Sequence, residues 1–183
     1  MLSGLWQESD LTDLQHKYVS HQMNAYQTAG DDPVLQKLLH SAITQVQAAE
    51  GSILLLADQG QSLEFALSES PVAEKLIGLH QPLDKGITGL AFTLQQPMIV
   101  NDVGCDASFD PTVQNHSGVE TRSIMVVPLV SPEAEYGAVT AINSKSGCFT
   151  ESDLTAFGES SRLIVERLDE LDLSLPSPND GSF

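Results

Sequence analysis

Three apolar segments of strand length constrain the fold of this chain more than any other feature of its sequence. Residues 53–57, 122–130 and 136–145 are largely apolar, with little alternation between the two sides of the strand. Such runs are typical of strands that are covered on both faces, so we expect them near the centre of a sheet. A short turn follows the first run, and five residues join the other two. These connections predict two hairpins and therefore an antiparallel sheet.

Helical patterns flank the predicted strands. Residues 34–46 carry a broad apolar stripe, and Asp32-Pro33 before them is typical of a helix start. Thr150 and Asp153 resemble a capping box ahead of a second stripe that ends near residue 168. Residues 5–28 carry a thinner stripe, and Gly30, Asp31 and Asp32 are expected to end this helix. A short helix is expected over residues 70–78. Strands in hairpins with helices at both ends indicate an α+β fold.

Residues 86–102 are the segment most typical of a ligand pocket. A Gly-x-x-Gly step, Gly86 and Gly89, opens a short helical pattern, Pro97 ends it, and a brief apolar strand leads to Asn101 and Asp102. The N–H groups at such a helix start can face a small ligand. We expect the two glycines and Pro97 to be scaffold residues. The polar segment 104–121 follows, and long loops of this kind are usually functional or mobile.

The charge of the chain limits its partners. It has 8 Lys and Arg against 25 Asp and Glu, a net charge of −17 and a pI near 4.3. Such a surface repels phosphate backbones and anionic lipids, so we expect neither nucleic acid nor membrane as a partner. Absence of an apolar stretch long enough to span a bilayer favours a cytoplasmic location. Cys105 and Cys148 are expected to be free thiols, and no metal site is predicted.

Short motifs in a fixed order resemble those of GAF domains, the small-molecule sensory modules of phosphodiesterases, histidine kinases and transcriptional activators. The resemblance covers residues 32–171. It rests on Gly51-Ser52-Ile53-Leu54-Leu55, Pro82-Leu83, Gly86-Ile87-Thr88-Gly89, Gln96-Pro97-Met98-Ile99-Val100-Asn101-Asp102, Asp106, Phe109, Ser123 to Leu129, Gly137 to Asn143, and Phe149-Thr150 with Asp153.

The resemblance implies a GAF/PAS-like antiparallel sheet of about six strands. The terminal helices should pack on one face, and loops and short helices should form a pocket on the other. It divides the chain into an amphipathic helix at residues 1–31, the GAF domain at 32–171 and a flexible tail at 172–183. We expect a free-standing sensory or regulatory module that binds an unidentified small molecule. It would signal through a homodimer contact of the N-terminal helix or through a separate signalling protein.

Nine residues are the candidate pocket residues, and none is expected to be catalytic. Asn101, Asp102 and the loop beyond them should determine specificity, while Arg122 could hold a carboxylate or phosphate or could pair with Glu120 at the surface. The candidates are Phe92, Asn101, Asp102, Asp106, Phe109, His116, Arg122, Ser123 and Met125.

Two ligand classes of the family match this sequence only in part. Members that bind cyclic nucleotides carry a motif that Asn143, Phe149 and Asp153 fit, but Ser144 and Leu154 depart from it. These residues also suit structural roles. Members that bind bilins have a histidine directly after the chromophore cysteine. Here Asp106 follows Cys105, and the nearest loop histidine, His116, lies eleven positions on.

Two other functions stay open. Some single-domain relatives are free methionine sulfoxide reductases, whose chemistry needs a low-pKa thiolate and a resolving thiol; Cys105 would be the nucleophile here. A ligandless interaction domain is the other alternative. Its pocket would be filled by side chains of the protein itself, such as Phe92, Phe109 and Met125.

Overall fold

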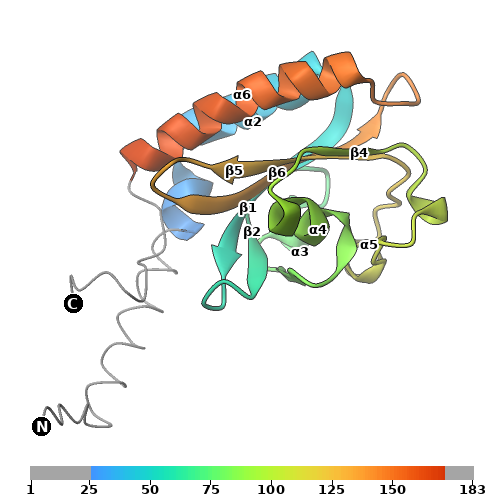
Figure 1. The fold of residues 1–183 in the computed structure, drawn as a ribbon, viewed down its shortest axis with the longest axis horizontal. Helices are drawn as coiled ribbons and strands as arrows, with labels where there is room; N and C mark the ends of the chain where they lie inside the picture. Colours follow the sequence, from blue (N-terminus) through green and yellow to red (C-terminus); the bar gives the residue numbers. More distant parts are fainter. Residues whose placement is uncertain (1–25, 172–183) are drawn as a thin grey trace, which may run out of the picture.

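The fold is a single six-stranded antiparallel sheet with helices on both faces. The computed structural model describes residues 26–171. The strands stand in the order β3-β2-β1-β6-β5-β4, so the apolar segments occupy β1, β6 and β5 at the centre, as predicted (Figure 1). Their bounds are β1 Ala48–Ala57, β2 Ser62–Glu69, β3 His80–Pro82, β4 Met98–Val100, β5 Ile124–Val130 and β6 Glu135–Ser144.

The helices divide between the two faces of the sheet. The long helices α2 (Pro33–Gln45) and α6 (Glu151–Glu170) lie side by side over one face (Figure 1). The short helices α3 (Ala73–Leu76), α4 (Gly86–Leu94) and α5 (Thr112–Ser117), with the 3-10 turn η1 (Val103–Cys105), lie on the other. The predicted α+β fold with its two unlike faces is therefore confirmed.

The two predicted helix starts are present. Asp32 caps α2, its carboxylate accepting the N–H groups of Val34 at 3.0 Å and Leu35 at 2.8 Å. The Arg167 guanidinium of α6 also bonds that carboxylate, with Nη2 at 2.7 Å from Oδ2, so the start of one long helix is tied to the end of the other. Thr150 and Asp153 form the predicted capping box of α6.

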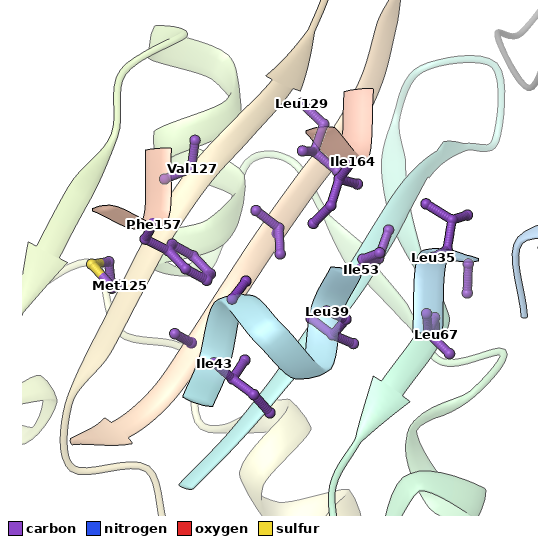
Figure 2. Packing of buried hydrophobic residues seen from close by; sticks show 14 of the residues in the cluster. Leu35, Leu39, Ile43, Ile53, Leu67, Met125, Val127, Leu129, Phe157 and Ile164 are labelled. Atoms are coloured by element: carbon purple, nitrogen blue, oxygen red, sulfur yellow. The ribbon is translucent and has the colours of Figure 1, made fainter. Parts of the chain in front are cut away.

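A continuous apolar core fills the space between the sheet and the two long helices. Leu35, Leu39 and Ile43 from α2 and Phe157 and Ile164 from α6 meet the strand side chains (Figure 2). The strands contribute alternate residues to this layer, among them Ile53, Met125, Val127 and Leu129. Because it is apolar throughout and closed by two helices, this layer stabilises the domain.

Several expectations about element bounds are corrected. Gly51 precedes the apolar run 53–57, yet it lies inside β1 and pairs with Ala141. A Cβ at Gly51 would stand 2.3 Å from Ile43 Cγ2, so glycine lets α2 approach the sheet closely. The edge strand β3 was not predicted because its three residues, His-Gln-Pro, form no apolar run, unlike the equally short β4, Met-Ile-Val. The segment 104–121 is not wholly irregular, since it contains α5 and part of η1.

Two expectations concern the ends of the chain. Residues 26–31 are helical, and Asp32 interrupts the helix before α2 begins, so Gly30 does not end it. The rest of the predicted N-terminal helix and the predicted tail lie outside the described residues. Over residues 26–171, no helix has both the length and the apolar character that crossing a bilayer requires.

Candidate ligand pocket

A cavity of about 70 Å³ lies on the face of the sheet opposite α2 and α6. Strands β1, β2, β5 and β6 form its floor, α3 and the start of α4 form its sides, and α5 with its flanking loops covers it. Its lining comprises Glu50, Gly51, Ser52, Phe65, Leu76, Gln81, Gly86, Ile87, Thr88, Phe109, Asp110, Val113, Gln114, Ser117, Val119, Thr121, Ile124, Thr140 and Ile142.

The start of α4 brings hydrogen-bonding groups to the cavity. Lys85 occupies the N-cap position without a side-chain cap, and the N–H groups of Gly86, Ile87 and Thr88 have no acceptor among residues 26–171. Thr88 is only 4% exposed, lines the cavity, and has a hydroxyl with no hydrogen-bond partner among the described residues. A buried unpaired hydroxyl is costly, so this wall is suited to a ligand atom that would pair with it.

Among the described residues, the charged side chains that line the cavity are two carboxylates, Glu50 and Asp110. Glu50, half-buried at the β1 end of the floor, accepts a hydrogen bond from the Ser70 hydroxyl. Asp110 accepts from the N–H of Thr112 at 3.0 Å and from its hydroxyl at 2.6 Å. These bonds, together with the charge of Lys85, lower the pKa of Asp110. No Lys, Arg or His lines the cavity.

The floor of the cavity touches the helix layer through a single residue. Gly51 lines the cavity with its backbone, while its other side faces Ile43 and Leu39 of α2. Only one layer of backbone therefore separates a ligand from α2 at this position.

One of the nine predicted pocket residues, Phe109, lines the cavity. Phe92 is buried in the apolar cluster beneath α4 rather than in the lining. His116 and Arg122 are exposed and outside the lining. The backbone N–H of Arg122 donates to Asn143 Oδ1 at 2.8 Å, so its strand end is fixed by the main chain while its side chain faces solvent.

Four of the predicted residues make local structural contacts. Asn101 binds the backbone of Phe149 twice, donating to its carbonyl at 2.9 Å and accepting from its N–H at 2.7 Å. Asp106 accepts the N–H of Ser108 in a turn, and Ser123 accepts the N–H of Ser144. Asp102 is exposed, beside Cys105. None of the four lines the cavity.

The placement of Met125 in the pocket is wrong. Met125 is fully buried in the core under α6, close to Phe157 and on the opposite face of the sheet (Figure 2). Side chains alternate along a strand, so the pocket side of β5 carries Ile124 and Val126 instead. The sequence of β5 could not fix this choice because both sets are apolar.

The residues that partly match the cyclic-nucleotide motif have structural roles. Asn143 has a left-handed backbone, φ 59°, and its side chain bonds the backbone of Glu120, Arg122 and Ser123. Phe149 is buried in the helix-side core. Asp153 completes the capping box of α6.

Neither cysteine lies in the cavity lining. Both Cys105 and Cys148 are free and exposed. A hydrogen bond to the Asp102 carboxylate and its negative charge raise the pKa of the Cys105 thiol, opposite to the shift that an attacking thiolate needs. Among residues 26–171 no three His, Cys, Asp or Glu side chains are grouped to hold a metal.

Glu50 and Thr88 are two of the polar lining residues that the sequence did not single out as ligand-binding candidates. Thr88 sits within the Gly-x-x-Gly step, which drew attention only for its glycines. The available signal was the lack of a capping side chain at Lys85, which leaves the first turn of α4 unsatisfied. Glu50 directly precedes Gly51, but nothing local distinguishes it from an exposed acid.

Solved structures similar to this one are mostly GAF domains. The second GAF domain of DevS from Mycobacterium smegmatis matches with a TM-score of 0.62 and 17% identity, covering 77% of this chain and 96% of that one. The GAF domain of a two-component sensor histidine kinase from Bacillus halodurans has a TM-score of 0.60 and 16% identity, covering 76% and 96%. Free methionine-R-sulfoxide reductase from Neisseria meningitidis matches with a TM-score of 0.57 and 19% identity, covering 92% and 96%. At these identities the likeness concerns the fold alone.

The sequence itself matches the family described as GAF domain over residues 31–169, most of the chain. This span includes both long helices, all six strands and the cavity. GAF domains are in general sensory or regulatory modules that bind ligands. The chain therefore belongs to the GAF domain family.

Proposed function

We propose that this protein is a sensory or regulatory module that binds a small molecule in the cavity beneath α5 and transmits occupancy through its long helices. The observation that carries the proposal is Thr88, a 4% exposed residue of the cavity lining at the uncapped start of α4, whose hydroxyl has no partner among residues 26–171. Buried polar groups are normally paired, so a missing partner at a cavity supports a bound one.

The cover of the cavity is the part most easily reorganised by a ligand. α5 has six residues and, beyond its own turn, is held by bonds such as Thr121 N–H to Gln114 Oε1 at 2.9 Å. At about 70 Å³, the cavity has room for only a few water molecules. A larger ligand would displace α5, and the proposal is that binding orders residues 104–121 around it.

Transmission would pass through the floor of the cavity. Gly51 connects the cavity to Leu39 and Ile43 of α2, and Arg167 joins α6 to Asp32 at the start of α2. A change at β1 would thus reach both long helices. Val34 of α2 and Leu163 of α6 are large apolar residues on the outer surface of this layer, which suits a homodimer or partner contact.

The location proposed for this module is the cytoplasm. Exposed free thiols at Cys105 and Cys148 suit a reducing compartment. The positions of the thiols, outside the lining, offer no support for the reductase alternative. Assay of NADPH-coupled turnover of free methionine sulfoxide would test that alternative directly.

Native mass spectrometry of freshly purified protein, followed by hydrogen exchange, tests the proposed function. We expect a retained mass that is lost on denaturation, and slower exchange over residues 104–121 in the loaded protein. Val113→Trp should fill the cavity from α5 and abolish both signals, whereas Val130→Trp, outside the lining, should leave them. Absence of any retained mass, with no exchange protection from a metabolite extract, would contradict the proposal.

A further inference from the structure

The charge of the cavity restricts what can occupy it. Its two charged side chains, Glu50 and Asp110, are both acids, and no cationic side chain lines it. Asp110 is partly neutralised by Lys85, whereas Glu50 forms no ion pair with any residue of 26–171 and its carboxylate accepts a hydrogen bond from the Ser70 hydroxyl. An anionic ligand such as a phosphate would have to approach an uncompensated carboxylate.

The part of the lining at the start of α4 offers hydrogen-bond donors. The N–H groups at the start of α4 are donors without acceptors, and the Thr88 hydroxyl can also donate. These groups favour an oxygen acceptor on the ligand. Elsewhere in the lining, Phe65, Ile124 and Ile142 provide an apolar surface.

We propose that the ligand is a small molecule with a primary ammonium group facing Glu50 and an oxygen acceptor facing Thr88 and the first turn of α4. This inference rests on the proposed function. The cavity volume of about 70 Å³ corresponds to roughly five waters, so the part of the ligand held in the cavity has only a few non-hydrogen atoms. A nucleotide is too large and carries the wrong charge for the cavity as it stands.

Matched probes of similar size separate the two recognition elements. The probes are L-alanine, 2-aminopropanol, propylamine and propionate, titrated into 15N-labelled protein and followed by the backbone amide shifts of cavity residues. We expect L-alanine and 2-aminopropanol to bind most tightly, propylamine to bind more weakly, and propionate to bind at least about tenfold more weakly than L-alanine.

Two variants assign each end of the ligand to its wall. Glu50→Gln keeps the size of the side chain and should weaken all three ammonium probes about tenfold. Thr88→Val should weaken L-alanine and 2-aminopropanol several-fold and leave propylamine unchanged. Glu74→Gln, an exposed acid on α3 outside the lining, is the matched control and should change nothing. The same spectra report whether each variant is folded, and Thr88→Val tests the proposal even if Glu50→Gln does not fold.

The outcomes distinguish this inference from the proposed function. Tighter binding of propionate or cyclic AMP than of L-alanine at the cavity would overturn the inference and leave the proposed function standing. Equal binding of the ammonium probes to wild type and to folded Glu50→Gln would do the same. If no probe shifts cavity amides and native mass spectrometry retains no ligand, both are contradicted.

Discussion

The sheet face under α2 and α6 carries a continuous apolar layer, whereas the opposite face, under α3, α4 and α5, encloses a cavity with polar groups in its lining. Both faces are built by the same strands, because successive side chains point to opposite sides. In β5, Met125 belongs to the first face and Ile124 to the second. The closed layer provides stability, which allows the other face to keep unpaired groups for a ligand.

Truncating one aromatic side chain on each face should give the largest difference in unfolding free energy between the two faces. Phe157→Ala, at a fully buried position, is expected to destabilise the protein by about 3–5 kcal/mol through lost burial and the cavity left behind. Phe109→Ala, at the half-buried cavity rim, should cost no more than about 1–2 kcal/mol. Urea unfolding measures both. Equal losses would show that the two faces contribute alike to stability.

Gly51→Ala should disturb the packing of α2 on β1, next to the cavity. The new methyl group would stand 2.3 Å from Ile43 Cγ2 and 2.8 Å from the Thr140 carbonyl, so α2 must shift or the strand must bend. We expect a loss of about 2–3 kcal/mol.

Gly158→Ala is the matched control for Gly51→Ala. Gly158 lies within α6, and a Cβ there meets nothing within 4 Å, so helix propensity should stabilise this variant by up to about 1 kcal/mol. A neutral effect of Gly51→Ala beside a stabilised Gly158→Ala would mean that α2 is not closely packed on β1.

Asp32→Asn tests the electrostatic link between the two long helices. The bonds from Arg167 and from the backbone hold the pKa of Asp32 below its usual value, although burial opposes them. A lowered folded-state pKa stabilises the protein above the unfolded pKa, near 4, and this stabilisation is lost as pH falls through the folded value.

Since asparagine retains the helix cap, the variant should be about 1–2 kcal/mol less stable at pH 7 because it weakens the pair with Arg167. The difference from wild type should shrink as pH is lowered below 4. Chemical denaturation across about pH 2.5–7, the range in which carboxyl groups titrate, measures this difference in stability. Asp31→Asn, at an exposed position, is the control. A constant difference over this range would contradict the assigned role of the charge.

Thr88→Val should have the smallest effect on stability, and it should not destabilise the ligand-free protein. Its buried hydroxyl has no partner among the described residues, so replacing it by a methyl group should leave the ligand-free protein unchanged or stabilise it by up to about 1 kcal/mol. Thr140→Val removes a hydroxyl that faces the Ser52 carbonyl at 3.5 Å and should be neutral or slightly destabilising. Thermal unfolding of ligand-free protein checks both, and clear destabilisation by Thr88→Val would mean that the hydroxyl is paired.

Much of the fold could be predicted from the sequence because its signals are local or periodic. Asp32-Pro33 and Thr150 with Asp153 mark helix starts through bonds to neighbouring N–H groups. The apolar runs identified the central strands, since only a strand covered on both faces buries every side chain. The three residues of β3, His-Gln-Pro, are not an apolar run, so this strand was missed although the apolar β4 of the same length was not.

The site could be predicted only in part. Of residues 86–102, Gly86, Ile87 and Thr88 line the cavity, as does Phe109 of the following loop. Asn101 instead secures the chain before α6, because its side-chain amide pairs with both the backbone N–H and the carbonyl of Phe149, 48 residues away. A polar side chain at a strand end can serve either purpose, and its partner is not visible in the local sequence.

The sequence by itself determined the order of elements, the helix caps, the acidic charge and the family. Only the tertiary structure decided which side of β5 faces the cavity, that Gly51 lies between the cavity and α2, and that the unpaired Thr88 shares a cavity lining with Glu50. The physical reason is that caps and periodicity depend on neighbours within a few positions. Burial, pairing and lining instead depend on segments brought together across the sheet, such as β1 and β6, whose paired residues Gly51 and Ala141 lie far apart in the chain.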